Sequence, residues 1–226
     1  MNETVRVSRE RPVRVSAGIV TLEGDLSIPK DAQGIVVFAH GSGSSRLSPR
    51  NRRVAEQLRQ AGLATLLFDL LTKQEETVDM RTGHLRFDIP LLARRLVDAT
   101  DWVQQDEDTR DLPVGYFGAS TGAAAALMAA VERPLVVKAV VSRGGRPDLA
   151  ASALPEVEAP TLLFVGGQDF AVIDLNRDAL RHLKAEKQLV IVPGATHLFE
   201  EPGALEEVAR LAAEWFRKYL KRGTPA

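Results

Sequence analysis

Short runs of consecutive apolar residues alternate along the chain with longer segments in which apolar residues recur every three to four positions. A short continuous apolar run is typical of a strand that is covered on both faces. The longer periodic segments predict helices, which supply the crossover connections that parallel strands require. The expected strands are residues 35–39, 64–68, 114–117, 138–141, 161–165 and 188–192, and the expected helices are residues 50–61, 87–104, 121–132, 174–184 and 204–219.

Two earlier segments, residues 13–16 and 19–28, show alternating apolar and polar positions on either side of Ala17-Gly18. Such alternation around a glycine turn predicts an antiparallel pair of strands. Together the elements predict an α/β fold, with a mostly parallel sheet of about seven or eight strands and helices on both faces. No internal repeat or long linker divides the chain, so we expect a single domain over residues 1–226. In such sheets, ligands bind outside the carboxyl ends of the strands.

The composition narrows the class of protein without revealing its chemistry. The 226 residues include 29 Lys and Arg against 30 Asp and Glu, a near balance that argues against a nucleic-acid-binding protein. The longest unbroken apolar stretch, residues 123–131, is far shorter than the ~20 residues that a membrane span requires. The absence of cysteine excludes disulfides and thiolate catalysis. The N-terminus lacks the apolar core of a signal peptide, so we expect a cytoplasmic protein with no nucleic-acid or membrane partner.

The clearest chemical motif is Gly118-Ala119-Ser120-Thr121-Gly122, which lies between an expected strand and an alanine-rich expected helix. A nucleophilic serine has to be held on a tight strand-to-helix turn, and glycines two positions before and after it let the strand and the helix approach closely. The alternative interpretation is an ordinary helix N-terminus that Ser120 caps. The strand–turn–helix context favours the nucleophile.

The expected strand at residues 35–39 is followed by His40-Gly-Ser-Gly-Ser-Ser45, whose small residues can direct backbone N–H groups into a site. A tetrahedral oxyanion needs preorganised donors of this kind, and the expected pair is the backbone N–H groups of Ser42 and Thr121. A phosphate-binding loop is the rival interpretation, but the run lacks the Gly-Lys-Ser/Thr ending of such loops. We expect His40 to be structural, with its ring hydrogen-bonded to the loop.

A general base and the acid that orients it are expected at two later strand ends. His197 follows the last expected strand and is the expected base; the remaining histidines are His40, His84 and His182. Asp169 follows the preceding strand and is the expected acid. Asp174 is the fallback acid, although it is better interpreted as the cap of the helix that is expected to begin there. The chain order Ser120, Asp169, His197 is one that serine hydrolases use.

These motifs together resemble the α/β-hydrolase superfamily, from about Val13 to Tyr219. The size, the lack of a cap insertion and the segments Gly166-Gly-Gln-Asp169 and Pro193-Gly-Ala-Thr-His197 look most like the dienelactone-hydrolase-like group of small esterases. His40-Gly-Ser-Gly-Ser-Ser-Arg46 and Ser142-Arg-Gly-Gly-Arg146 also look like hydrolase domains that are fused to phosphoribosyltransferases. Dienelactone hydrolases proper use a cysteine nucleophile. This chain has no cysteine, so the resemblance favours a serine esterase.

The resemblance implies a carboxylesterase-type serine hydrolase that cleaves small carboxylic esters through an acyl-enzyme. Ser120 would attack the ester, His197 would take its proton and Asp169 would orient the imidazole. Hydrolysis of a lactone or a thioester is the alternative, and a binding protein with an idle triad is a further one. No His, Asp or Glu cluster has metal-ligand spacing, so neither a metal nor a cofactor is expected. The expected partner is a small-molecule ester.

Arginines cluster near the expected mouth of the site, at positions 46, 50, 52, 53, 143 and 146. A guanidinium binds carboxylate or phosphate bidentately, so Arg143 and Arg46 are candidate substrate-binding residues. Arg143 is favoured because it directly follows a buried strand; the alternative is solvated surface charge. Residues 72–86 are expected to form an irregular stretch that overhangs the site as a mobile flap, and residues 146–160 are too few for a helical lid.

Overall fold

The apolar runs lie side by side as parallel strands because each strand is buried between two layers of helices. In the computed structural model, which describes residues 7–222, the strands form one sheet in the order β1-β2-β4-β3-β5-β6-β7-β8. Strands β3 to β8 are parallel, whereas β2 is antiparallel to both β1 and β4. The strands are β1 (Val7–Ala17), β2 (Val20–Pro29), β3 (Ile35–Ala39), β4 (Ala64–Phe68), β5 (Val114–Ala119), β6 (Val137–Arg143), β7 (Thr161–Gly166) and β8 (Lys187–Val192).

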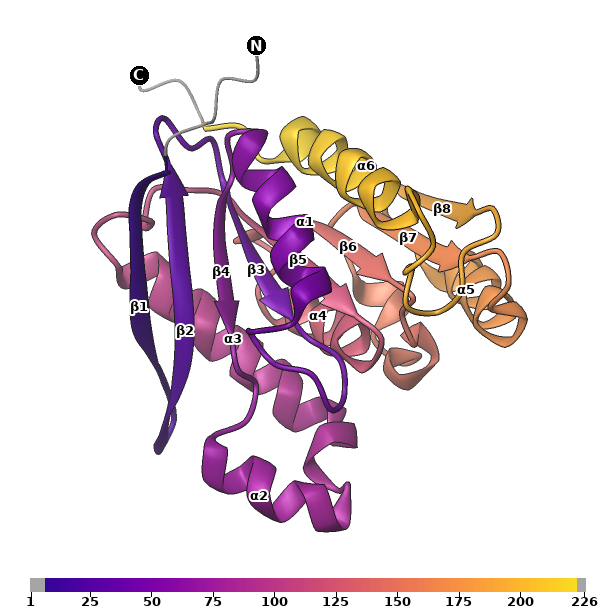
Figure 1. Ribbon diagram of the computed structural model, residues 1–226, viewed down its shortest axis with the longest axis horizontal. Coiled ribbons are helices and arrows are strands. Elements are labelled where there is room, and N and C mark those ends of the chain that lie inside the picture. Colours follow the sequence, from indigo (N-terminus) through magenta and orange to yellow (C-terminus); the bar gives the residue numbers. More distant parts are fainter. Residues whose placement is uncertain (1–6, 223–226) are drawn as a thin grey trace.

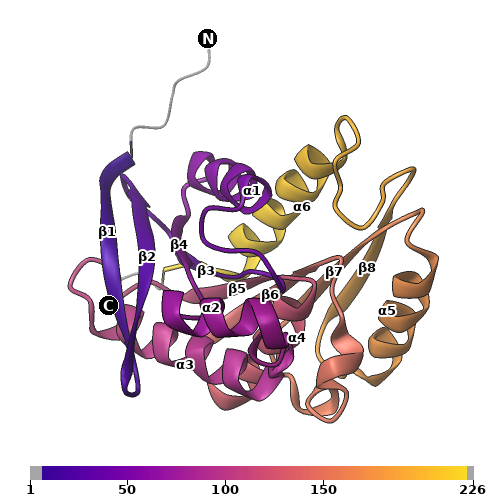
Figure 2. The same ribbon diagram turned by 60° about the horizontal axis from the view of Figure 1, so that its bottom comes forward.

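Helices cover both faces of this sheet (Figures 1 and 2). Helices α1 and α6 pack against each other on one face, and α3, α4 and α5 lie on the other. Helix α2 lies beyond the carboxyl ends of β3 and β4 (Figure 1). The helices are α1 (Pro49–Gln60), α2 (Lys73–Thr82), α3 (Ile89–Gln105), α4 (Thr121–Glu132), α5 (Phe170–His182) and α6 (Ala204–Tyr219), with short 3₁₀ helices η1 (Leu85–Phe87), η2 (Pro147–Ala150) and η3 (Leu154–Glu156).

Strand β5 shows why the central strands are apolar throughout. Its residues Val114 and Tyr116 belong to the core beneath α3 and α4, whereas Phe117 belongs to the core beneath α1 and α6. Tyr116, the one polar side chain among these, is fully buried and shares a 2.6 Å hydrogen bond with the Thr100 hydroxyl of α3. The expected α/β fold, with an antiparallel pair leading into a parallel sheet, is therefore confirmed.

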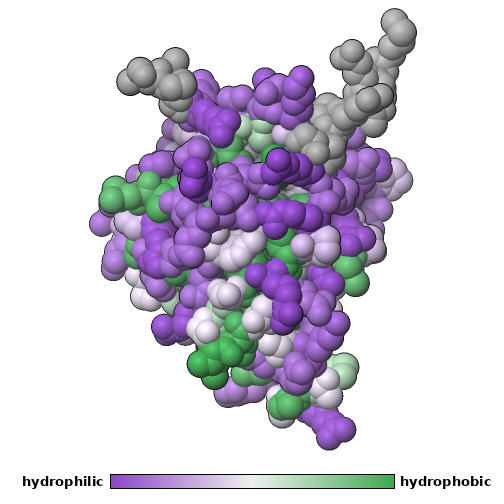
Figure 3. Space-filling view, turned by 90° about the vertical axis from the view of Figure 1, so that its left-hand side faces the viewer, coloured by the Kyte–Doolittle hydropathy of each residue, from purple (hydrophilic) through white to green (hydrophobic). Residues whose placement is uncertain are grey.

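The sheet edge at β1 carries charged residues rather than a bare apolar strand. Figure 3 views the molecule from this side, and hydrophilic side chains dominate the face. Arg9 and Arg11 of β1 form ion pairs with Asp108 and Asp106, which lie between α3 and β5. Charge on an edge strand hinders pairing with another chain. None of the helices described within residues 7–222 combines the length and apolar character that a membrane span requires.

The prediction of an irregular stretch at residues 72–86 is wrong, because this stretch forms α2 and η1. Thr72 and Glu75 form a capping box: the Thr72 hydroxyl accepts from the Glu75 N–H (3.2 Å) and a Glu75 carboxylate oxygen accepts from the Thr72 N–H (2.7 Å). Gly83 ends α2 in the left-handed conformation. The helix is polar on most sides, so hydrophobic periodicity does not reveal it, but the Thr-x-x-Glu pattern and the terminal glycine are readable signals.

The expected start of the next-to-last helix is also wrong. Helix α5 begins at Phe170, directly after Asp169, rather than at Asp174. Asp174 therefore lies within the helix, where its side chain is exposed and pairs with Arg177 at 3.4 Å. The tight turn at Gly167–Asp169 starts the helix earlier than the apolar pattern indicates, because the Asp169 N–H donates to the Gly166 carbonyl at 2.9 Å.

Candidate active site

Ser120 lies on a sharp turn between β5 and α4. Its backbone has φ 51° and ψ −120°, a left-handed φ that is strained for a residue with a side chain. Backbone hydrogen bonds hold the turn: the Ser120 N–H donates to the Arg143 carbonyl (3.2 Å), and the Ser120 carbonyl accepts from the Ala123 (3.1 Å) and Arg146 (3.1 Å) N–H groups. This is the geometry that presents a nucleophile at the top of such a sheet.

The two motif glycines are required by close contacts. A Cβ atom at Gly118 would lie 2.4 Å from Ala123 Cα, and one at Gly122 would lie 2.2 Å from the Ala39 carbonyl oxygen. The interpretation of Ser120 as an ordinary helix cap is not supported, because its side chain forms no capping hydrogen bond although it occupies the cap position of α4. Its hydroxyl is thus available for chemistry.

His197 and Asp169 come together from the ends of β8 and β7. An Asp169 carboxylate oxygen lies 2.6 Å from His197 Nδ1, so the Nδ1–H donates to it and Nε2 faces away as an acceptor. The two loops are joined by backbone hydrogen bonds from Gly167 N–H to Val192 O (2.8 Å) and from Gln168 N–H to Ala195 O (2.9 Å). The imidazole remains partly exposed.

The segment after β6 places this pair beside the Ser120 turn. Arg143 accepts the hydrogen bond from Ser120, and the next residue, Gly144, lies against the His197 ring. A Cβ atom at Gly144 would lie 3.4 Å from both Nδ1 and Cε1 of His197. Within residues 7–222, the Ser120 hydroxyl makes no hydrogen bond to His197; such bonds are often loose until a substrate is bound.

The expected oxyanion loop lies directly against the turn. A Cβ atom at Gly41 would lie 3.1 Å from Ser120 Cβ. The backbone N–H of Ser42 donates to the Thr121 hydroxyl at 2.9 Å. Sequence reasoning expected this N–H to point freely into the site, whereas the structure shows that a neighbouring side chain already accepts from it.

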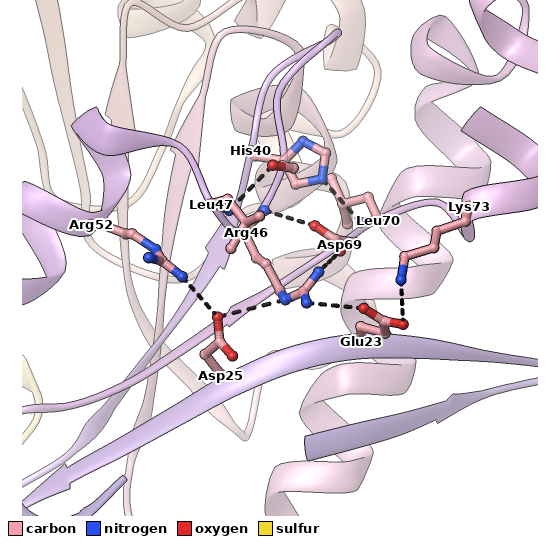
Figure 4. Close-up of polar contacts among 10 residues, drawn as sticks. Glu23, Asp25, His40, Arg46, Leu47, Arg52, Asp69, Leu70 and Lys73 are labelled. Carbon is pink, nitrogen blue, oxygen red and sulfur yellow. Dashed lines mark hydrogen bonds and ion pairs between the residues drawn. The ribbon is translucent and has the colours of Figure 1, made fainter. Parts of the chain in front are cut away.

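His40 is structural, as predicted. The side chain is buried, and Nδ1–H donates to the Gly41 carbonyl (3.0 Å). Nε2 accepts from the Leu70 N–H at 3.0 Å (Figure 4). Burial lowers the pKa of His40, which keeps the ring neutral and in this tautomer. The ring thereby joins the loops after β3 and β4. His84 and His182 are exposed and lie outside the site.

Arg46 occupies a carboxylate cluster rather than the mouth of the site (Figure 4). Its guanidinium contacts Asp69, Glu23 and Asp25, and its backbone N–H donates to Asp69 at 2.7 Å. Charges of opposite sign already surround this cation, so the candidate role of Arg46 in holding a substrate anion is not supported. Arg146 is similarly paired with Asp148. Arg143, in contrast, is buried at the end of β6 beside Ser120.

A cavity of about 850 Å³ opens between the loop after β3, at residues 40–48, and α2. Apolar side chains from both elements line it, including Leu47, Leu71 and Met80, together with Glu76 and Arg86. Gly41 and Ser42 belong to this lining and also contact the Ser120 turn, so the cavity adjoins the turn. Sequence reasoning expected an overhanging segment but missed its helical residues. In the described part of the chain, no group of three His, Asp or Glu residues could hold a metal ion.

The strand order and the serine turn at the carboxyl edge define the α/β-hydrolase fold. A dienelactone hydrolase from Anabaena variabilis has the same structure with a TM-score of 0.93 and 68% identity, over 94% of this chain and 99% of that chain. The Est1E protein from Butyrivibrio proteoclasticus has a TM-score of 0.77 over 92% of this chain and 98% of its own, and at 16% identity it shows the shared fold alone.

The dienelactone hydrolase family model matches residues 22–221, and the chain belongs to this family. Two curated proteins from Mycobacterium tuberculosis strains, both named as phosphoribosyl transferases, are 59% identical over 212 residues, which are 94% of this chain and 47% of theirs. The chain thus spans about half the length of the curated relatives that it matches. The sequence resemblance to hydrolase domains that are fused to phosphoribosyltransferases points to proteins of the same name.

Replacing Gly144 with alanine tests whether His197 is held by the backbone beside it. At φ 53° an alanine is strained by about 1–2 kcal/mol, and its Cβ would also lie 3.1 Å from the His197 carbonyl oxygen, close enough to displace the backbone that carries the imidazole. We expect Gly144→Ala to weaken the hydrogen bond between His197 and Asp169, measured as a shift or loss of the downfield Nδ1–H proton resonance in NMR spectra.

Gly62→Ala is the matched control, because Gly62 has φ 83° but nothing within 4 Å of an added Cβ. It should lose similar stability and leave the His197 resonance unchanged. Equal effects of the two substitutions on that resonance would contradict the assigned role of Gly144.

Proposed function

We propose that the protein is a serine hydrolase that cleaves small carboxylic esters through a covalent acyl-enzyme. The observation that carries this proposal is the strained Ser120 turn at the same sheet edge as the 2.6 Å His197–Asp169 hydrogen bond. Backbone strain of this kind is retained where function requires it. The family membership and the 68% identity to a protein named dienelactone hydrolase support hydrolysis as the class of reaction.

In the proposed reaction, the Ser120 hydroxyl attacks the ester carbonyl while His197 Nε2 accepts its proton. Asp169 fixes the tautomer that leaves Nε2 free and stabilises the imidazolium that forms. The same imidazolium then protonates the departing alcohol oxygen, and an acyl-serine remains. His197 next takes a proton from water, which attacks the acyl carbon and releases the carboxylic acid and Ser120.

The negative charge of the tetrahedral intermediate requires N–H donors. The proposed donors are Thr121, at the N-terminus of α4, and Ser42. Because the Ser42 N–H donates to the Thr121 hydroxyl in this structure, we propose that rotation of the Thr121 side chain releases it when a substrate binds. The helix dipole of α4 adds positive potential at the same place.

The proposed substrates are small, soluble esters because no long helical lid covers the site on the side of β6 and β7. The segment between β6 and β7 contains only short 3₁₀ helices, and α2 adds the one helical cover on the other side. A cavity of about 850 Å³ with both apolar and charged residues suits a small ester that carries polar groups. A lactone, which is a cyclic ester, is the second candidate, and the 68% identity to a protein named dienelactone hydrolase favours it.

The proposed function is tested by hydrolysis of p-nitrophenyl acetate, butyrate and octanoate. We expect turnover that falls with chain length, and a loss of kcat of roughly 10³-fold or more in Ser120→Ala. Ser16→Ala, on an exposed position of β1, is the control and should match the unaltered protein. Near-normal turnover by folded Ser120→Ala would remove Ser120 from the mechanism, and a lactone substrate measured in parallel separates the two candidate functions.

Replacing Asp169, with Asp174 as a control, tests whether Asp169 orients His197. Asp169→Asn keeps the shape of the side chain but favours the wrong imidazole tautomer, so kcat should fall by roughly 10³–10⁴-fold. Asp174→Asn alters an exposed residue of α5 that pairs with Arg177 and should leave kcat unchanged. If the two variants lose activity equally, Asp169 does not orient His197.

A further inference from the structure

The described part of the chain buries two arginines, Arg95 and Arg143, to the same extent, each with 7% of its surface exposed. The charge of Arg95 is paired, since Nη1 donates to the Ala17 carbonyl (3.0 Å) and Nη2 donates to Glu75 (2.9 Å), although its Nε is buried without a partner. Within residues 7–222, the Arg143 guanidinium donates no hydrogen bond and has no carboxylate at ion-pair distance, and its Nη1 is buried without a partner. Arg143 is therefore a buried cation that lacks its anion.

A folded chain rarely keeps such a charge without a reason. Burial removes the hydration of the guanidinium, and an uncompensated buried charge is strongly unfavourable. The ring of Phe117, whose centroid lies 6.0 Å from the guanidinium carbon, offers only weak compensation. Burial and, secondly, the charge of Arg50 lower the pKa of Arg143 to about 10, so the side chain is still charged at neutral pH.

The charged group that acts on Arg143 is another arginine, and no carboxylate within residues 7–222 lies at ion-pair distance from Arg143. Arg50, on the first turn of α1, lies close enough to act on Arg143, and its own Nε is buried without a partner. Its Nη1 pairs with Glu200 at 2.6 Å, which leaves the rest of the guanidinium free. The first turn of α1 contains no acidic residue. The helix N-terminus therefore adds to the positive potential instead of cancelling it.

This unpaired cation lies next to the proposed nucleophile. Arg143 is the last residue of β6 and pairs in register with Ala119 of β5. Its carbonyl accepts the hydrogen bond from the Ser120 N–H at 3.2 Å. The side chain extends from this point across the Phe117 face, toward α1. An anionic group held there would lie at the same sheet edge as an ester bound at Ser120.

We propose that Arg143, assisted by Arg50, forms an anion-binding site beside Ser120 that takes a carboxylate or phosphate group. A guanidinium presents paired N–H donors that match such groups. If the bound anion is part of the substrate, which rests on the proposed function, the substrate is an ester that carries a carboxylate or a phosphate group. Anion binding itself requires no turnover.

Calorimetric titration of Ser120→Ala with inorganic phosphate, and separately with monomethyl succinate, tests the site independently of catalysis. At constant ionic strength, we expect saturable binding of at least one of these anions. Binding should weaken at least tenfold when Arg143→Met is added. Arg53→Met is the matched control, because Arg53 is an exposed cation of the same helix as Arg50 and its loss removes one positive charge elsewhere. It should leave binding unchanged.

The melting temperature of Arg143→Met separates a binding role from a structural one. Replacing an unpaired buried charge by an apolar side chain of similar length should leave the melting temperature unchanged or raise it. A structural arginine would instead make the variant less stable. If Arg143→Met does not fold, the wild-type titration and Arg50→Met, which changes a partly exposed residue, still decide the proposal.

A pair of esters that differ only in charge shows whether the anion is part of the substrate or a separate, free anion. We compare kcat/KM for mono-p-nitrophenyl succinate and for its neutral methyl ester. A preference of tenfold or more for the anionic ester that disappears in Arg143→Met identifies a substrate group, whereas phosphate binding without such a preference identifies a free anion. Absence of saturable binding of both anions to Ser120→Ala, or binding that survives Arg143→Met, overturns the proposal whether or not the protein hydrolyses esters.

Discussion

The close approach of β3, β5 and α4 at the Ser120 turn is the constraint on which the site depends. A single Cβ at Gly122 would meet the Ala39 carbonyl at 2.2 Å, so the helix can begin at this depth only because glycine stands there. Because α4 begins so close to β3, the backbone of Ser120 is held in its strained conformation and the loop after β3 packs against it. Gly144 extends the same close packing to His197. The proposed catalytic residues are therefore positioned mainly by backbone contacts between strand ends.

The arginines of this region differ in whether carboxylates or carbonyls within the chain compensate their charge. Arg46 is partly buried and forms ion pairs with three carboxylates. These ion pairs hold the loop after β3 against β2 and against the residue that follows β4. Arg95 anchors α2, through Glu75, to α3 and to the turn between β1 and β2. Both are structural because their charges are compensated within the chain. Arg143 has no such compensation, which is why the same residue type, equally buried, is interpreted there as a binding group.

Much of this architecture could be predicted from the sequence. Strands buried on both faces are continuous apolar runs, and the expected limits of β3, β4, α4 and α6 agree with the structure. Helix α2 was not predicted because its apolar stripe is weak. Only its capping residues mark where the helix begins and ends. The partners of Arg46 could not be predicted, since Glu23, Asp25 and Asp69 come from distant segments and meet only in the folded sheet. The hydrogen bond that occupies the Ser42 N–H likewise depends on a contact between the loop after β3 and the first residue of α4.

The central claim is that the Ser120 turn holds an activated serine, and covalent labelling tests it most directly. A fluorophosphonate phosphonylates serines whose hydroxyl is activated by a neighbouring base, with loss of fluoride. Intact mass spectrometry of the folded protein should show one adduct, which peptide mapping assigns to Ser120 and which is absent from Ser120→Ala. No adduct, or an adduct on a serine of the neighbouring loop at residues 42–48, would contradict the account.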